Sequence, residues 1–356
     1  MPRLALPDFL QGPDTAPILD VRAPVEYAHG HIPGALSFPL FSDEERARIG
    51  TTYKQASQDK AVLLGLDLFG PKMSQLVKIA HKLAPGKEVR LHCWRGGMRS
   101  GAVQWLLELA GFKVLLLNQG YKEYRHWALA QFAAARPLLV LGGLTGSGKT
   151  DVLHALARRG EPVVDLEGLA SHKGSAFGSI GLPPQPTQEQ FENDLAAALA
   201  RISTEAPLWV EDESRTIGSM QVPPPLFRQM GAAPLVVLEI PRAVRVRKLA
   251  AEYGREDSGA LATSILRIRK RLGGLATKEA LSAIAEDDME KMVSLVLDYY
   301  DKTYGHGLTG RPAIRVASDT CDAAVNAELV LAATRPAKLL PATALPLPAA
   351  APPHGA

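Results

Sequence analysis

Cysteine is scarce in this sequence, and its scarcity excludes several kinds of protein. The chain of 356 residues contains two cysteines, Cys93 and Cys321. Two cysteines cannot form the disulfide framework of a small secreted domain, and they cannot form a cysteine-rich zinc site. Cys93 must therefore be explained either as a small buried side chain or as a reactive thiol.

Long apolar runs are also missing. Charged residues or prolines interrupt every apolar segment before it reaches the length of a membrane span. The N-terminal segment MPRLALPDFLQGPD lacks the apolar core and the cleavage site of a secretory signal. We therefore expect a cytoplasmic protein with no membrane partner. The net charge of +3 is too small to indicate nucleic-acid binding by itself, so the position of the positive charge matters more.

Two α/β blocks follow one another along the chain, which is long enough for two domains. In the first block, the apolar strands PILDV and EVRLHC alternate with helical segments such as SGAVQWLLELAGF. The second block begins at PLLVLGGLTGSGKT and continues through PVVDLE, PLWVEDES and PLVVLEIPR, which are typical of buried parallel strands. With the junction at Ala133–Pro137, we expect domains at residues 1–133 and 134–333. Residues 334–356 are rich in proline and alanine, which predicts a disordered tail.

A strand, a glycine-bearing loop and a helix surround Cys93 in the segment LHCWRGGMRS. Successive backbone amides in such a loop form an anion-binding nest, and the following helix adds the positive end of its dipole. These amides and the two arginines favour a thiolate, so we predict that Cys93 is a nucleophile. The loop residues expected to hold an oxyanion donor are Arg95, Gly96, Gly97, Met98 and Arg99.

The segment DVRAPVEYAHGHIPGA, taken together with the Cys93 loop, resembles the rhodanese-like domain. That resemblance implies a loop cysteine that carries sulfur or selenium. It also implies that GHIPGA is architectural, so that His29 and His31 are structural rather than catalytic.

The spacing His-Cys-x5-Arg-Ser, from His92 to Ser100, is also the signature of cysteine-dependent phosphatases. Such an enzyme needs a carboxylic acid to protonate the leaving alcohol, and the loop itself contains none. Glu26 or Asp43 could approach from elsewhere. We favour sulfur or selenium transfer, and the loop alone leaves the phosphatase alternative open.

A phosphate-binding motif begins the second block. GLTGSGKT matches G-x-x-x-x-G-K-[ST] in full, between a predicted buried strand and a predicted helix. Glycines let the backbone approach phosphates, Lys149 reaches the outer phosphoryl oxygens, and the Thr150 hydroxyl suits a Mg²⁺ ligand. We expect no tightly bound cofactor, and Mg²⁺ at Thr150 is the candidate metal. The predicted diphosphate-binding residues are Gly143, Thr145, Gly146, Ser147, Gly148, Lys149 and Thr150.

Acidic residues follow two strands of the second block. The strand in PLWVEDES ends beside the phosphate loop, where a P-loop fold holds its magnesium or a base. Alternation would place Glu211 and Glu213 on one face and Asp212 on the other. The segment VVDLEGLASHKGSAFG adds Asp165 and Lys173 as candidates, and it also contains Glu167, His172 and Ser175. The alternative is a solvated acidic turn.

Positive charge is densest in IPRAVRVRKLAAEYG and in SILRIRKRLGG. In the second of these, apolar residues lie at helical spacing on one face, and basic residues cluster on another. Neutralising phosphates would explain such a cluster, and a solvated helix surface would explain it equally well. The candidate contacts to RNA or phosphate are Arg242, Arg245, Arg267, Lys270 and Arg271.

The order CWRGGMRS, GLTGSGKT, SHKGSAFG and VEDESRTIG resembles the tRNA 2-selenouridine synthase family over nearly the whole chain, apart from the tail. The resemblance implies an α/β protein with a rhodanese-like domain followed by a P-loop NTPase-like domain containing a parallel sheet. It also implies a transferase that replaces the sulfur of wobble 2-thiouridine in tRNA by selenium from selenophosphate. The family passes through S-geranyl-2-thiouridine, which is formed from geranyl diphosphate. An enzyme that supplies selenophosphate is a candidate partner.

This chemistry fits both predicted sites. A thiocarbonyl sulfur is a poor leaving group, whereas an alkylated sulfur departs readily as a thiol. The phosphate loop would hold the diphosphate of the prenyl donor, and Cys93 would receive or deliver selenium. One alternative is a P-loop ATPase or kinase regulated by a sulfur-carrier or phosphatase-like domain. Another is a catalytically silent module that recruits tRNA.

Overall fold

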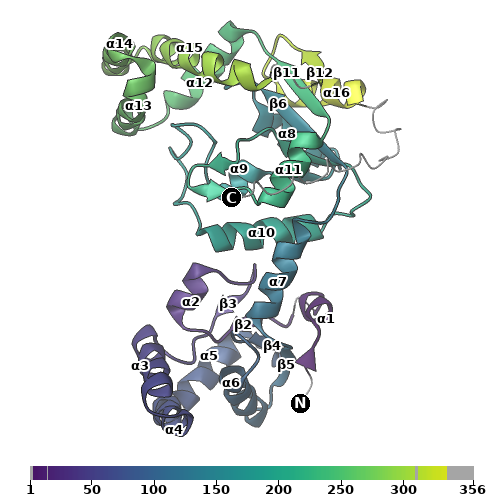
Figure 1. The fold of residues 1–356 in the computed structure, drawn as a ribbon, viewed down its shortest axis with the longest axis vertical. Helices are drawn as coiled ribbons and strands as arrows, with labels where there is room; N and C mark the ends of the chain where they lie inside the picture. Colours follow the sequence, from purple (N-terminus) through teal and green to yellow (C-terminus); the bar gives the residue numbers. More distant parts are fainter. Residues whose placement is uncertain (1–2, 14, 309–311, 335–356) are drawn as a thin grey trace, which may run out of the picture. The chain divides into compact units, whose positions relative to one another are not determined.

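The computed structural model describes residues 3–13, 15–308 and 312–334, with side chains described except at 303–308. The predicted tail lies outside the described residues from position 335 onward. The chain forms two compact units, both drawn in Figure 1. The first, called here the Cys93 unit, comprises Met1–Ala134, Gln185–Arg201 and Ser219–Pro223. The second, called the P-loop unit, comprises Ala135–Pro184, Ile202–Gly218 and Pro224–Ala356.

The Cys93 unit contains a five-stranded parallel sheet with strand order β1-β5-β4-β2-β3. Its strands are β1 (Arg3–Leu4), β2 (Ile18–Asp20), β3 (Leu36–Ser37), β4 (Glu88–His92) and β5 (Lys113–Leu117). The central strand β4 pairs Leu91 with Leu19 on one side and with Leu116 on the other. All three of these leucines are buried. Strand β4 is buried from Val89 to His92, as expected of a parallel strand that is covered on both faces.

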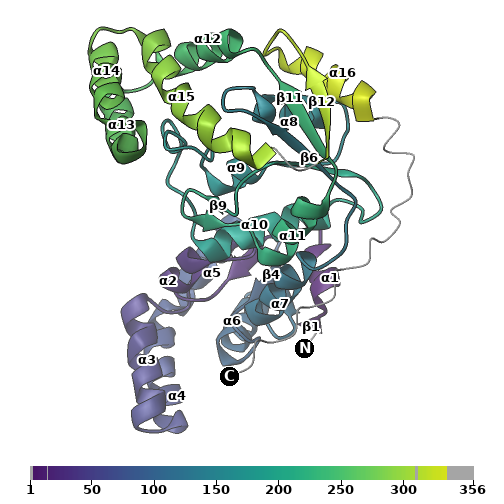
Figure 2. The same cartoon turned by 45° about the horizontal axis from the view of Figure 1, so that its top comes forward.

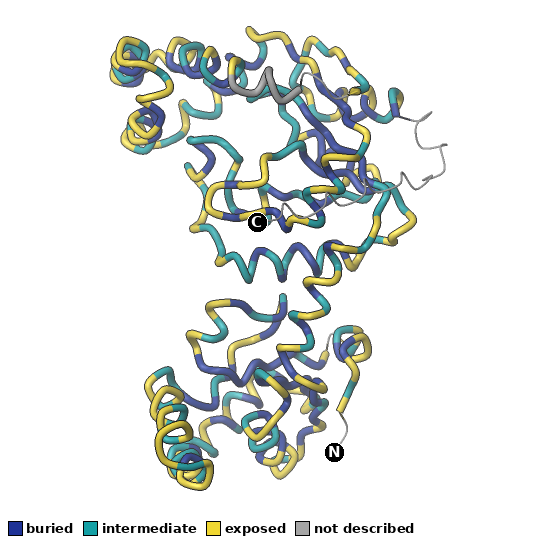
Figure 3. Tube along the Cα trace, viewed as in Figure 1, coloured by how far each residue is buried: buried dark blue, intermediate teal, exposed yellow. Residues whose placement is uncertain are grey.

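Helices surround this sheet. They are α1 (Leu6–Leu10), α2 (Pro24–His29), α3 (Asp43–Gln55), α4 (Gln58–Phe69), the short η1 (Gly70–Lys72), α5 (Met73–Leu83), α6 (Met98–Leu109) and α7 (Tyr121–Gln131). Serine side chains define two of the helix starts, because Ser42 accepts a hydrogen bond from the amide of Glu45 and Ser57 accepts one from that of Lys60. These N-caps satisfy amides that would otherwise lack a partner in the first turn. The burial map in Figure 3 shows that much of α3 and α4 is exposed, whereas the inner strands β2, β4 and β5 are mostly buried.

A later segment of the sequence also belongs to the Cys93 unit. It includes α10 (Gln188–Ala200) and the short strand β10 (Met220–Gln221). The fully buried Asn193 of α10 donates from Nδ2 to the Tyr121 hydroxyl at 2.7 Å and to the His31 carbonyl at 2.9 Å. Arg125 of α7 forms an ion pair with Glu192 at 2.6 Å. The predicted domain boundary at residue 133 therefore left α10 out of the first domain, whereas the structure includes it in the Cys93 unit.

The P-loop unit contains a second five-stranded parallel sheet, with strand order β12-β11-β6-β8-β7. Its strands are β6 (Leu138–Gly143), β7 (Val163–Val164), β8 (Leu208–Glu211), β11 (Leu235–Glu239) and β12 (Ala313–Ala317), and a short strand β9 (Thr216–Ile217) lies outside this sheet. The central strand β6 lies between β8 and β11, so the loop that follows it begins at the middle of the sheet (Figure 2). The carboxyl ends of β6 and β8 therefore lie side by side, as ligand sites in such folds require.

The remaining helices of this unit are α8 (Lys149–Arg158), α9 (Leu166–Ala170), α11 (Pro224–Ala232), α12 (Arg242–Tyr253), α13 (Ser258–Leu272), α14 (Gly274–Ala285), α15 (Met289–Leu308) and α16 (Ala323–Thr334). Helices α12 to α15 share a separate apolar cluster that includes Leu249, Ile265, Ala280 and Val293. The predicted apolar face of α13 lies in this cluster, and its basic side chains are exposed. In the part of the chain that the structure describes, none of the helices has both the length and the apolar character of a membrane span. The α/β fold class with parallel sheets is confirmed.

Candidate active sites in the two units

The Cys93 loop runs from the end of β4 at His92 to the start of α6 at Met98. The turn between β5 and α7 is hydrogen-bonded to this loop, because the Tyr121 amide donates to the Cys93 carbonyl at 2.8 Å. Gly120 in that turn has φ +64°, and a Cβ atom there would lie 2.4 Å from the Cys93 carbonyl oxygen. Only glycine fits this position. Gly120 was not among the predicted site residues, although a glycine shortly after the apolar segment KVLLL is typical of a turn.

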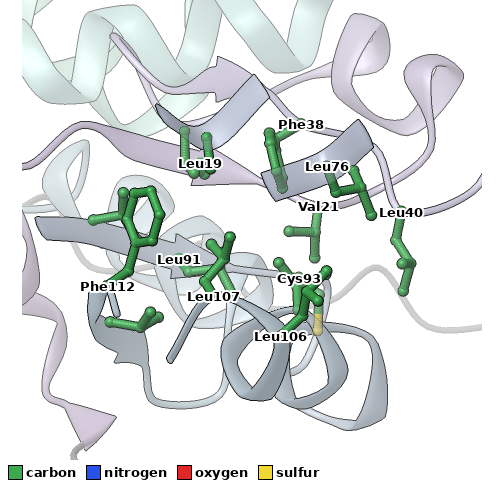
Figure 4. Packing of buried hydrophobic residues seen from close by; sticks show 14 of the residues in the cluster. Leu19, Val21, Phe38, Leu40, Leu76, Leu91, Cys93, Leu106, Leu107 and Phe112 are labelled. Atoms are coloured by element: carbon green, nitrogen blue, oxygen red, sulfur yellow. The ribbon is translucent and has the colours of Figure 1, made fainter. Parts of the chain in front are cut away.

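The Cys93 sulfur is packed in the core and is also hydrogen-bonded. The residue is 3% exposed and lies among Val21, Leu91 and Leu106 (Figure 4). Its Sγ atom lies 3.2 Å from the Ser100 hydroxyl oxygen. Burial opposes ionisation, but hydrogen bonds from the Ser100 side chain and from the loop and helix amides outweigh it. Together with the charge of Arg99, they hold the pKa of the Cys93 thiol below its usual value.

The two cysteines are expected to differ in the pH dependence of their alkylation. Burial raises the pKa of the Cys321 thiol, whereas that of Cys93 is lowered. Because the thiolate is the nucleophile, the iodoacetamide rate at Cys93 should reach half of its plateau at a lower pH than the rate at Cys321. Peptide mass spectrometry of one sample gives both profiles, so Cys321 is the internal control. A midpoint at Cys93 equal to or above that at Cys321 would contradict the assignment.

His92 does not act as the base for Cys93. Its ring is fully buried and lies 3.8 Å from Asp20. Burial lowers the pKa of His92 to about 4, so the ring is neutral at physiological pH. Asp20 itself forms a buried ion pair with Arg22 at 2.6 Å. The lowered pKa of Cys93 is therefore explained by the loop amides, Ser100 and Arg99.

Arg99 is held over the loop by a carboxylate from another helix. Its Nη1 atom donates to Glu26 of α2 at 2.7 Å. Burial favours the protonated form of Glu26, but the hydrogen bond and charge of Arg99 outweigh it and lower the pKa. Glu26 is thus an ionised partner of arginine rather than a protonated acid. Asp43, the other candidate acid of the phosphatase alternative, caps α2 by accepting from the Val25 amide at 2.9 Å.

The other predicted loop residues differ in exposure. Gly96 is buried, whereas Arg95, Gly97 and Met98 are exposed. The two histidines predicted to be architectural differ in their contacts. The His31 ring stacks on Tyr27 with centroids 3.9 Å apart, and its Nδ1 atom lies 3.0 Å from the Tyr27 carbonyl oxygen. The His29 side chain is exposed, and its backbone carbonyl accepts a hydrogen bond from the Thr187 hydroxyl.

In the P-loop unit, the phosphate loop connects β6 to α8, and α8 begins at Lys149. Gly146 and Gly148 both have φ +81°, which the loop requires in order to turn its amides inward. The Lys149 ammonium donates to the Gly143 carbonyl at 3.2 Å, across the mouth of the loop. Thr145 and Ser147 complete the loop, and Ser147 is buried. The structure thus brings the predicted diphosphate-binding residues into one cradle.

The Thr150 hydroxyl lies between two carboxyl groups. Its oxygen is 2.6 Å from Glu211 and 2.8 Å from Glu167. A hydroxyl has one proton to donate, so two ionised carboxylates cannot both receive it, and one of the pair must carry a proton. Burial, reinforced by the charge of Glu167, raises the pKa of Glu211 well above its usual range. Burial also raises the pKa of Glu167, which was present in the predicted loop but was not chosen as a site residue.

Glu213 adds a third carboxyl to this cluster, in which Glu211 is buried and Glu167 and Glu213 are half-buried. Burial raises its pKa from 4.5 to about 7, with the charge of Lys149 opposing the rise and that of Glu167 increasing it. Glu211 and Glu213 therefore both lie close to Glu167. Asp212 points elsewhere, because its carboxylate lies near Gly142 of β6. This arrangement follows from the alternation of side chains at the end of β8.

The raised pKa of Glu213 predicts a loss of stability at alkaline pH. The carboxyl ionises near 4.5 in the unfolded chain and near 7 in the folded chain. Its contribution is fully present below 4.5 and is lost as the pH rises through about 7. Glu213→Gln removes this dependence, and between pH 5 and pH 8 the variant should gain roughly 1–3 kcal/mol relative to the natural chain. Calorimetric melting of both proteins at the two pH values measures this, and parallel pH profiles would contradict it.

The remaining candidates near the phosphate loop have other partners. Asp165 caps α9 by accepting from the Gly168 amide at 2.7 Å and pairs with His154 at 2.8 Å. Lys173 lies near the cluster, where its charge favours ionisation of Glu167. Among the described residues, no group of three or more histidine, cysteine, aspartate or glutamate side chains has the arrangement of a metal site. Mg²⁺ at Thr150 therefore stays a prediction.

Arg245 supports the phosphate loop from behind. It is buried, pairs with Asp301 at 2.7 Å and donates to the Thr145 carbonyl at 3.1 Å. With these partners, the Arg245 guanidinium stabilises the backbone of the loop and is not exposed to a bound ligand. Arg242, one turn earlier on α12, pairs with Asp298 at 2.7 Å.

The basic residues of α13 lie on its exposed face. This helix is far from the phosphate loop along the sequence. Arg267, Lys270 and Arg271 are all exposed, and Arg271 lies 3.4 Å from the Tyr299 hydroxyl. Arg267 also lines a small polar pocket with Glu256 and Asp257. Their contact with RNA stays a prediction.

Comparison with known proteins finds similarity across both units. A family model described as the tRNA 2-selenouridine synthase AAA domain matches residues 136–329, and the rhodanese-like domain model matches residues 5–126. The tRNA 2-selenouridine synthase of Salmonella enteritidis is 38% identical over 350 residues, which cover 87% of this chain and 94% of that protein. The one from Salmonella newport (strain SL254) is 39% identical over 337 residues, covering 83% and 90%.

Among solved structures, the N-terminal domain of a protein described as ATP/GTP binding, from Clostridium difficile 630, is 35% identical to the matching part of this chain. The match covers 35% of this chain and 98% of that one, with a TM-score of 0.34.

Proposed function

The chain belongs to the tRNA 2-selenouridine synthase family, and from that premise we propose that it exchanges the wobble sulfur of tRNA for selenium in two steps. In the first step, the sulfur of 2-thiouridine attacks the prenyl carbon of geranyl diphosphate. The carbon–sulfur bond forms, the carbon–oxygen bond breaks, and diphosphate leaves with the electron pair. In the second step, selenium replaces the alkylated sulfur, which leaves as geranyl thiol. The tRNA is the macromolecular partner, and the enzyme that makes selenophosphate is the candidate protein partner.

The phosphate loop would carry the first step. Its inward amides and the Lys149 ammonium suit the charge that develops on the departing diphosphate. The carboxyl groups of Glu167, Glu211 and Glu213 lie close to this cradle, and the pKa of each is raised above its usual value. A raised pKa lowers the share of negative charge on these groups and so limits their repulsion of an anionic donor. Mg²⁺ bound by the Thr150 hydroxyl would add further positive charge to the same leaving group.

Cys93 would activate selenium for the second step. Its thiolate can attack the phosphorus of selenophosphate, so that a sulfur–phosphorus bond forms and the phosphorus–selenium bond breaks. Selenide leaves with the electron pair and becomes the nucleophile for the second step. Water then hydrolyses the phosphorylated cysteine and regenerates the thiol. The amides and Arg99 around the loop suit the phosphoryl oxygens of this donor.

The single observation that supports this division most strongly is the pairing of two anion sites with different chemistry in one chain. One contains the Cys93 sulfur, and the other contains the Lys149 ammonium and no cysteine. A kinase or ATPase would need the second site alone, and a sulfur carrier would need the first alone. We place the reaction in the cytoplasm, with no membrane partner.

Deleting the gene tests the proposal in cells. Wobble nucleosides from tRNA of the deletion strain should retain 2-thiouridine and contain neither 2-selenouridine nor its S-geranyl form, with or without selenium in the medium. Parental cells without selenium should accumulate the S-geranyl nucleoside, and adding selenium should convert it. Selenated tRNA in the deletion strain would refute the proposed function.

A further inference from the structure

A cavity of about 700 Å³ lies in the Cys93 unit, beside the Cys93 loop, with which it shares Met98 and Arg99. This volume falls within the range of roughly 300–1,000 Å³ that is typical of small-molecule sites. Helices α3 and α4 and the first turns of α6 line it. Its apolar wall includes Leu40, Phe41, Ile49, Leu66, Phe69 and Met98.

The cavity is adjacent to the Cys93 loop. Leu40, Phe41 and Phe69 line the cavity and pack in the same hydrophobic cluster as Cys93. Figure 4 shows Leu40 and Cys93 at the same end of that cluster. Arg99, whose charge stabilises the thiolate, also lines the cavity. A group bound in the cavity would therefore lie next to the loop that cradles the sulfur.

Cationic side chains predominate in the cavity lining, and two of them, Arg46 and Arg99, pair with Glu26 beside it. Its lining contains three cationic side chains, from Arg46, Lys54 and Arg99, and no carboxylate. The mouth is apolar and open to water, because Leu66 is 55% exposed and Met98 is 63% exposed. Exposed apolar side chains grouped around a cavity mark a binding site rather than ordinary surface. This combination fits an apolar group attached to a polyanion such as RNA.

We propose that the cavity binds the geranyl chain of the S-geranylated wobble base, and so presents that base to the Cys93 loop. The inference rests on the proposed function, because only that function supplies an isoprenoid chain bound to tRNA. The chain would be buried against α4 and α6, while the cationic edge would face the phosphates of the anticodon loop. The Cys93 unit would then discriminate the alkylated intermediate from unmodified tRNA before selenium is delivered.

Two variants on the same helix test the proposal. Leu66 lines the cavity, whereas Leu63 is 62% exposed and does not line it. The probe is a synthetic anticodon stem-loop RNA that carries S-geranyl-2-thiouridine, compared with the same RNA carrying S-methyl-2-thiouridine. The full-length chain should bind the geranyl RNA about tenfold or more tightly than the methyl RNA. Leu66→Glu should remove this preference without weakening the methyl RNA, and Leu63→Glu should keep it.

The outcomes separate this inference from the proposed function. Equal binding of the two RNAs by the natural chain, or an unchanged preference in Leu66→Glu, would overturn the cavity assignment. Competition by geranyl diphosphate that persists in Lys149→Ala would also overturn it, because the cavity would then hold the free donor. The synthetic RNA makes the assay independent of geranyl transfer, which the nucleoside analysis of deletion cells tests separately. Equal melting temperatures of both variants exclude misfolding.

Discussion

Replacing Cys93 with alanine is expected to abolish 2-selenouridine formation while leaving S-geranylation of tRNA largely intact. The thiolate is required for selenium activation, and the lysine of the phosphate loop lies in a different unit. We expect selenation to fall on the order of 10³-fold or more, the scale seen when an enzyme loses its nucleophile. Mass spectrometry of digested tRNA after reaction with geranyl diphosphate and selenophosphate measures both products.

The burial of Cys93 makes controls necessary. The residue is 3% exposed and belongs to the core cluster, so alanine removes a packed sulfur atom. Cys93→Ser preserves the volume more closely and should behave like the alanine variant. Cys321→Ala is the matched cysteine control and should retain both activities. Normal selenation by Cys93→Ser would contradict the role of the thiolate, and loss of geranylation in a folded Cys93→Ala protein would contradict separate sites.

Lys149→Ala is expected to have the opposite effect. Without the ammonium, the diphosphate leaves with less stabilisation, so geranyl transfer should slow by about 10²–10³-fold. Selenation of ordinary 2-thiouridine tRNA should fall with it, because the intermediate is not made. The folded loop should persist, because the glycine conformations and the hydrogen bond from Arg245 remain when the hydrogen bond from Lys149 to Gly143 is lost.

Supplying the intermediate distinguishes the two steps. With tRNA that is already S-geranylated, Lys149→Ala should form 2-selenouridine at nearly the rate of the natural chain. Cys93→Ala should fail with the same substrate. If Lys149→Ala fails as well, while its melting temperature is unchanged, the phosphate loop has a role in selenation that the two-step account does not contain.

Short-range signals in the sequence predicted much of this molecule. The phosphate loop requires a strand, glycines with positive φ and a helix in immediate succession, and all three are encoded within a dozen residues. The Cys93 loop is local in the same way. The family inferred from four short motifs is confirmed by the comparisons. The tail prediction lies outside the described residues.

Features that depend on contacts between distant segments were not predicted. Helix α10 belongs to the Cys93 unit because the buried Asn193 bonds to residues more than 70 positions earlier, such as Tyr121. Glu167 completes the carboxyl cluster only because Thr150 and Glu211 meet it in space. Arg245 was expected to contact phosphate and instead holds the loop backbone, since Asp301 on α15 neutralises it. None of these partners lies at a spacing that a sequence pattern marks.

The most direct test of the central claim is a single-turnover time course with the natural chain, 2-thiouridine tRNA and selenophosphate, run with and without geranyl diphosphate. With the prenyl donor, S-geranyl-2-thiouridine should rise first and then fall as 2-selenouridine appears. Without it, no 2-selenouridine should form. Formation of 2-selenouridine at an undiminished rate in the absence of geranyl diphosphate would contradict the account.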